Sequence, residues 1–302
     1  MKNKLTEVII FVIFLSLIFY PDLVHKEIID ALKVFYKTLF PSIFPFFLFG
    51  NLLISYNFFN TVSIIFKNFT RRIFHISGNS FFIIIMSMVS GFPSGAKYIR
   101  DLYDKNLISI DQANYLIVFT HFANPLFVIT VTSVIFNDLK ISYMILISMY
   151  LSNFIIAFIT RPKKVDEVDY KKAIENTSFS IALSNALKDS FNVLIMILGN
   201  TCFFYLISRL VTFFLSPPIF IEIIINGFFD LTKGISSLGI INTSILLKGM
   251  LTLSFISFGG INIHMQVLNM IQDTKIKYNN FLLGRIAQAS ISSCLFFIFY
   301  TL

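Results

Sequence analysis

A lysine lies directly beyond a cluster of helix-breaking residues that interrupts an apolar run. Residues 90–97 read SGFPSGAK and follow the apolar residues 81–89. Glycine and proline break a helix and free backbone polar groups, which lipid cannot satisfy. A helix that begins after Ser94 and Gly95 would present unpaired N–H groups and a positive dipole end, which attract a carboxylate. The segment therefore predicts an anion site, to which Lys97 would add a full charge.

The residues that we predict for this half of the site are Ser90, Gly91, Pro93, Ser94, Gly95 and Lys97. An alternative interpretation of Lys97 stays open, because a lysine at the end of an apolar segment can also extend its side chain to the lipid headgroups.

A second break lies near the other end of the chain, where residues 257–264 read SFGGINIH. We expect Gly259 and Gly260 to interrupt the helix, and the residues after them to supply the neutral half of the binding site. Those residues are Asn262, His264 and Gln266. His264 is also a candidate proton carrier, although a lone histidine is commonly a hydrogen-bonded structural residue.

Polar side chains recur at helical spacing after both breaks. The first stripe is Lys97, Asp101 and Asp104, and the second is Asn262, Gln266, Asn269 and Asp273. Two interpretations are open: the stripes line an aqueous path, or they belong to amphipathic helices that rest at the membrane surface.

Three other polar positions interrupt apolar segments. Glu222 lies within IFIEIII, and a carboxylate inside a membrane suggests proton or cation coupling unless Pro217 and Pro218 place it at the interface. Asp230, in NGFFDLTKG, is a second candidate for coupling. Asn124 precedes Pro125, which would kink a helix and free a carbonyl group, so we include Asn124 in the predicted site.

The composition is that of a membrane protein. The 302 residues are 56% hydrophobic and 13% charged, whereas soluble domains carry about 25% charged residues. The net charge of +8 is spread between apolar segments rather than gathered in one patch, so we expect contact with lipid headgroups and no nucleic-acid partner. The sequence has no phosphate-binding GxxxxGK[ST] loop, no metal-ligand spacing among its histidines and no GxSxG motif, so we expect neither an enzyme nor a cofactor.

A membrane-spanning helix needs about 20 apolar residues. The candidate spans are residues 5–20, 39–56, 114–136, 141–160, 191–215 and 280–302. Two shorter apolar runs, residues 80–89 and 246–257, end at the breaks. We expect the first of these runs to turn back at the break, because this places the N-terminus, Lys67 to Arg72 and the basic loop 161–172 together on the cytoplasmic side.

The same argument places the second hairpin on the opposite face. The predicted fold is therefore an all-α polytopic membrane protein with two inverted repeats, each containing a broken re-entrant hairpin. Such repeats are common in secondary transporters, whose substrate sites lie at the repeat interface.

The motifs at the two breaks resemble those of the sporulation integral membrane protein family, which carries the gate-type repeat of nucleoside-recognition membrane proteins. The resemblance rests on residues 91–97, Leu102, 106–109 and 124–129 in the first half, and on residues 230–234, 258–260, His264 and 266–268 in the second. It implies a role in endospore formation and the movement of dipicolinate across the outer forespore membrane. The chain departs from the family pattern at His121, Phe122, Asn124 and Asp230.

With this resemblance, the chain divides into an N-terminal helix and linker (1–30), a first gate-type repeat (31–160), a basic cytoplasmic loop (161–178) and a second repeat (179–302). We expect an integral protein of the bacterial cell membrane that transports a small anionic metabolite by alternating access, with a homo-oligomer left open. The alternatives are a nucleoside-type permease or channel for a neutral solute, and a non-transporting membrane scaffold whose partners bind the basic loop.

Overall fold

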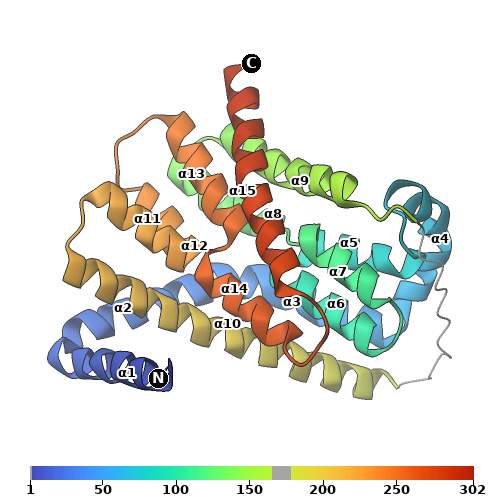
Figure 1. The fold of residues 1–302 in the computed structure, drawn as a ribbon, viewed down its shortest axis with the longest axis horizontal. Helices are drawn as coiled ribbons and strands as arrows, with labels where there is room; N and C mark the ends of the chain where they lie inside the picture. The colour runs from blue at the N-terminus through green and yellow to red at the C-terminus, as the bar shows by residue number, and fades with distance from the viewer. Residues whose placement is uncertain (1, 165–177) are drawn as a thin grey trace.

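The computed structural model describes residues 2–164 and 178–302, and within these ranges the chain is helical and contains no strand (Figure 1). The basic loop that was predicted for residues 161–178 lies mostly outside the described residues. The helices of the first half are α1 (Lys2–Phe19), α2 (Pro21–Val34), α3 (Phe40–Ser55), α4 (Phe58–Ile73), α5 (Gly78–Ser90), α6 (Ser94–Asp104), α7 (Ile110–Phe119), α8 (Pro125–Phe136) and α9 (Leu139–Thr160). Those of the second half are α10 (Phe179–Leu215), α11 (Ile219–Phe229), α12 (Leu231–Leu238), α13 (Ile245–Phe258), α14 (Gly260–Ile271) and α15 (Tyr278–Thr301).

Several helical stretches are long and apolar enough to cross a membrane. In the described ranges these are Pro21–Ser55, Leu139–Thr160, Phe179–Leu215, Ile245–Ile271 and Tyr278–Thr301. The amphipathic helix α4 and the apolar helix α5 form a further pair, bent by 92°. Large apolar side chains are exposed on the outer surface, as at Ile64 and Val134, each 80% exposed, and lipid is the solvent that suits them. The chain is therefore an all-α polytopic membrane protein, as the composition predicts.

The first hairpin consists of α5 and α6, which pack against each other across the break at residues 91–93. The predicted re-entrant turn at this break therefore has the geometry of a hairpin. The first broken span follows it and consists of α7 and α8, separated by residues 120–124.

The continuous span that we predicted for residues 114–136 is wrong. Asn124 ends the interruption and starts a new helix, because its side-chain oxygen accepts the N–H groups of Leu126 at 2.8 Å and Phe127 at 3.3 Å. Pro125 occupies the first turn, where a missing N–H group has no consequence.

The second hairpin does not lie at Gly259 and Gly260, where we predicted it. Those glycines instead interrupt the second broken span, α13 and α14, which form the single apolar stretch Ile245–Ile271. The second hairpin consists of α11 and α12, which pack against each other and turn at Asp230. The reason is local packing: a side chain on Gly234 would collide with the backbone of Gly227 on the other leg of the hairpin, and one on Gly227 would collide with Phe255 of α13.

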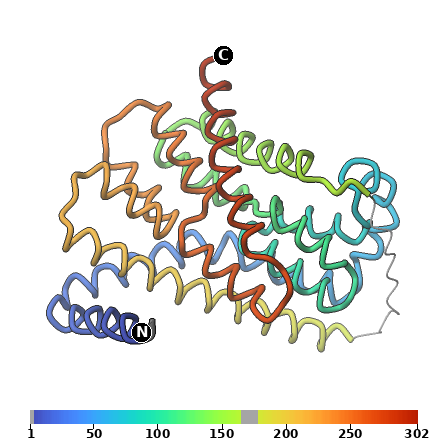
Figure 2. Tube along the Cα trace, viewed as in Figure 1, coloured from blue at the N-terminus to red at the C-terminus, as the bar shows by residue number. Residues whose placement is uncertain are grey.

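Each half thus has the order hairpin, broken span and long helix, ending with α9 and α15 respectively. Within each half, the hairpin turn meets the interruption of the broken span. A Cβ atom on Gly91 would lie 2.6 Å from the backbone nitrogen of Asn124, and one on Gly260 would lie 3.1 Å from the carbonyl oxygen of Phe229. α10 packs along α2 and α3, and Figure 2 follows it along the length of the described fold. That the two halves are inverted in the membrane stays a prediction.

Candidate functional site

A small central cavity lies where the two halves meet. Its volume is about 20 Å³, which is room for about one water molecule, so this arrangement is closed to a larger solute. The turn of the first hairpin contributes Phe92, and the second hairpin contributes Asp230 and Thr232. The remaining lining residues come from the α2–α3 segment, α10, α12 and α14: Leu39, Ile43, Ile197, Thr201, Leu231, Asn262, Ile263 and Gln266.

Asp230 is the charged residue of this cavity, and it is only 1% exposed. One carboxylate oxygen accepts the backbone N–H groups of Thr232 at 2.8 Å and Lys233 at 3.1 Å, which begins helix α12. The same oxygen accepts the hydroxyl of Thr232 at 2.5 Å. The other oxygen accepts the side-chain amide of Asn262. The carboxylate therefore joins the second hairpin to the second broken span.

Gln266 continues this network along α14. Its amide nitrogen donates to the side-chain oxygen of Asn262 at 2.8 Å. Its own side-chain oxygen is buried and has no hydrogen-bond partner in the structure. The predicted residues Asn262 and Gln266 thus lie together beside Asp230, and they leave one strong acceptor free at the cavity.

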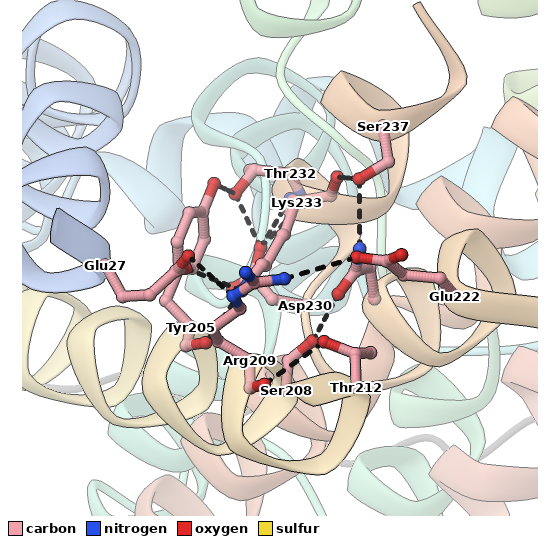
Figure 3. A network of polar contacts seen from close by, with 11 residues as sticks. Glu27, Tyr205, Ser208, Arg209, Thr212, Glu222, Asp230, Thr232, Lys233 and Ser237 are labelled. Atoms are coloured by element: carbon pink, nitrogen blue, oxygen red, sulfur yellow. Dashed lines mark hydrogen bonds and ion pairs between the residues drawn. The ribbon is translucent and has the colours of Figure 1, made fainter. Parts of the chain in front are cut away.

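A network of ion pairs flanks Asp230 on the side of α2 (Figure 3). Lys233 donates to Glu27 at 2.7 Å and to the carbonyl oxygen of Tyr205 at 2.8 Å. Arg209 lies 3.7 Å from Glu27 and 3.6 Å from Glu222. Glu222, which we singled out as an isolated acid, is therefore paired. Sequence reasoning missed Glu27, Arg209 and Lys233, because their partners are far away in the chain.

Lys97 does not line the central cavity. Its ammonium group donates to Asp101 at 2.7 Å and to the side-chain oxygen of Asn51 at 2.9 Å, and Asn51 donates in turn to Ser190 at 3.0 Å. These bonds join α6 to α3 and α10. The charge of Lys97 is balanced by a carboxylate one turn along its own helix, and the structure does not bring Lys97 together with Asn262 and Gln266.

The other predicted residues of the first break form hydrogen bonds within the protein. Asn124 donates to the carbonyl oxygens of Val89 at 2.7 Å and Ser42 at 3.0 Å. Ser94 donates to the carbonyl oxygen of Gly91, and Ser90 lies 3.4 Å from the hydroxyl of Tyr98. Gly95 packs against the carbonyl of Thr120, and Phe92 and Pro93 are joined by a cis peptide bond. Phe92 lines the cavity, whereas the other residues of this break make their contacts within the surrounding protein.

His264 lies outside the lining of the cavity. One ring nitrogen is 2.7 Å from the hydroxyl of Tyr278 and the other is 3.1 Å from the carbonyl oxygen of Phe258. Both nitrogens are thus engaged, which suits the structural interpretation of this residue. The ring of His121, in the first broken span, stacks on Phe92 at 4.8 Å.

Arg285 of α15 is fully buried and was not singled out in the sequence. Its guanidinium donates to the carbonyl oxygens of Val118 at 2.9 Å, His121 at 3.1 Å and Ser257 at 3.5 Å. Val118 and Ser257 lie at the C-terminal ends of α7 and α13, where each helix dipole places about half a negative charge, and His121 lies in the interruption that follows α7. Two such ends balance one guanidinium, and no carboxylate among the described residues pairs with it. The sequence feature that could have identified Arg285 is its position inside an apolar span, where a charged residue is rare.

Broken spans, hairpins and a small cavity that contains a buried carboxylate define a polytopic membrane protein with discontinuous helices, which is the architecture of many transporters. Over 90% of its length, the chain is 25% identical to the sporulation integral membrane protein YlbJ of Bacillus subtilis (strain 168), and the match covers 76% of that protein. This similarity supports a sporulation membrane protein family. No protein-family profile matches the chain. No solved structure matches it.

Proposed function

We propose that this protein transports a small polar metabolite across a bacterial membrane during endospore formation, with dipicolinate as the first candidate substrate. The observation that carries the proposal is the central cavity, which elements of both halves enclose and which contains the buried carboxylate of Asp230. Buried polar groups are costly in a membrane protein and mark solute or ion pathways. We propose no reaction for the site.

Alternating access would separate the two hairpins from the broken spans that they contact. The cavity then opens to one side of the membrane at a time, because the hairpin turns form its walls. The similarity to a sporulation integral membrane protein supports a membrane location. The outer forespore membrane, with the N-terminus in the cytoplasm, is the location that belongs to this proposal.

The charge of the substrate separates two versions of the proposal. In the anionic version, opening frees Lys97 from Asp101, and Lys97 and the start of α6 bind a carboxylate of dipicolinate. The neutral version is a permease or channel of the nucleoside type. It is favoured by the lining of the cavity, where Thr201, Thr232, Asn262 and Gln266 surround an acid and no lysine or arginine of the described residues takes part.

The test is uptake of radiolabelled dipicolinate and, separately, of uridine into proteoliposomes that contain the purified protein. Three variants are compared: Lys97→Ala, Asn262→Ala, and Lys188→Ala as a control at an exposed lysine. Dipicolinate uptake that Lys97→Ala and Asn262→Ala abolish supports the anionic version. Uridine uptake that only Asn262→Ala abolishes supports the neutral version. If a correctly inserted protein takes up neither solute, the transport proposal fails and a membrane scaffold remains.

A further inference from the structure

We propose that the central cavity binds one sodium ion between Asp230 and Gln266. The role of this ion rests on the proposed function: it would couple transport to a sodium gradient. Binding itself can be measured without transport.

The first argument is charge balance around Asp230. The network in Figure 3 contains three acids, Glu27, Glu222 and Asp230, and two bases, Arg209 and Lys233. Both bases contact Glu27 or Glu222, and Asp230 has no ion-pair partner among the described residues. The start of α12 offsets about half of its charge. A buried carboxylate requires a positive partner or a proton.

The second argument is the free acceptor on Gln266, which is 1% exposed and lines the same cavity. Its amide nitrogen bonds Asn262, and the amide nitrogen of Asn262 in turn bonds Asp230 and lies 3.4 Å from the hydroxyl of Thr201. These hydrogen bonds fix the orientation of both side-chain amides. The oxygen of Gln266 therefore remains as an acceptor without a partner. A cation in the cavity would balance the carboxylate of Asp230 and give this oxygen a partner.

The third argument is the match of ligand type and size. The oxygen-bearing side chains around the cavity are those of Asp230, Thr201, Thr232, Asn262 and Gln266. Oxygen ligands favour hard cations over soft ones. A single carboxylate neutralises a monovalent ion and leaves a divalent ion with excess charge. A volume of about 20 Å³ admits one particle of about the size of a water molecule, which favours sodium over larger monovalent ions.

The ion would join the turn of the second hairpin to α14 of the second broken span. Both carry ligands, and they already meet where Gly260 packs on Phe229. Sodium should therefore stabilise the closed arrangement, which is an effect that thermal unfolding detects.

The experiment uses the purified full-length protein in detergent, with Tm measured against sodium chloride at constant ionic strength in choline chloride. We expect Tm to rise with sodium and to change far less with potassium. Asp230→Asn and Gln266→Leu should weaken the apparent sodium affinity by roughly tenfold or more, as loss of groups around a metal does. Asp104→Asn, at an exposed carboxylate paired with Arg100, should retain the native sodium response.

A native protein without a sodium-specific rise in Tm overturns the proposal, and this result does not depend on any variant folding. If the Tm of Asp230→Asn rises with sodium as much as that of the native protein, the ion binds elsewhere and the proposal is wrong. If sodium binds but neither dipicolinate nor uridine is taken up, the site stands and the proposed transport function fails.

Discussion

Among the described residues, the two most deeply buried charges each lie at a helix end of opposite sign. Arg285 donates to the carbonyl groups of Val118 and Ser257 at the C-terminal ends of α7 and α13, and Asp230 accepts N–H groups at the start of α12. Broken helices expose these groups inside the membrane, and lipid offers them no partner. Single side chains therefore make the breaks tolerable.

Replacement of Arg285 should strongly destabilise the protein. In Arg285→Gln the carbonyl groups of Val118 and Ser257 lose the guanidinium donor, whereas that of His121 keeps the amide of Asn153. Each buried group left unsatisfied costs on the order of 1–3 kcal/mol. We expect a marked fall in Tm in detergent. The Tm of Arg285→Lys should lie between those of the native protein and Arg285→Gln, because an ammonium group is charged but lacks the fork of donors of a guanidinium. The control is Arg72→Gln, at an exposed arginine. A native Tm for Arg285→Gln would contradict this role.

Gly260 and Gly199 offer a matched pair for the same measurement. Gly260 has φ of 67°, and a Cβ atom there would lie 3.1 Å from the carbonyl oxygens of Gly227 and Phe229. Gly260→Ala should therefore lower stability by at least the roughly 1–2 kcal/mol of a left-handed alanine. Gly199 lies in α10 with open space around it, so Gly199→Ala should be neutral or stabilising by up to about 1 kcal/mol. Equal effects of the two substitutions would rule out close packing at the second hairpin.

At the scale of elements, each hairpin is attached by a lysine to the helical stretch Pro21–Ser55, which contains α2 and α3. Lys97 attaches α6 of the first hairpin to α3 through Asn51. Lys233 attaches α12 of the second hairpin to α2 through Glu27. Both lysine side chains are 12% exposed, so these contacts are shielded from water. They are the bonds that a rocking motion of the hairpins would have to break.

A double-mutant cycle measures the attachment of the second hairpin. Glu27→Gln and Lys233→Met should each destabilise the protein, because each leaves a buried charge without its partner at 2.7 Å. The double variant should lose less than the sum, with a coupling energy of about 0.5–3 kcal/mol. Thermal unfolding of the four proteins provides the values. Strict additivity would mean that the pair does not hold α12 against α2.

At the scale of the whole molecule, the two basic segments of the first half lie at the same end. His75, which follows α4, is 2.6 Å from the carbonyl oxygen of Pro162, which follows α9. Lys67, Arg71 and Arg72 belong to α4, and Arg161 to Lys164 begin the basic loop. A single membrane face can therefore contact both segments, as the distribution of positive charge predicts.

Cysteine labelling tests the orientation of the two halves. In a background without Cys202 and Cys294, Lys4→Cys and Lys164→Cys should react only with a reagent that reaches the cytoplasmic side. Asn242→Cys, between α12 and α13, should react only from the opposite side if the halves are inverted. Labelling of Lys164→Cys and Asn242→Cys from the same side would exclude inverted repeats.

The sequence alone determined the membrane class and the positions of the breaks near Gly91 and Gly259, because composition and helix-breaking residues act locally. It also identified Asn262, Gln266 and Asp230 as residues near a site, although not as neighbours. Their convergence on one cavity became visible only in the fold.

Only the tertiary structure decided which breaks turn back and which charges pair. A glycine or a capping residue ends a helix, but whether the next helix reverses depends on packing, as at Gly227 and Gly234. Glu27 and Lys233 are 206 residues apart, so no local pattern predicts their ion pair. For the same reason Lys97 was expected in the substrate site, whereas the fold brings Asn51 and Asp101 to its ammonium group.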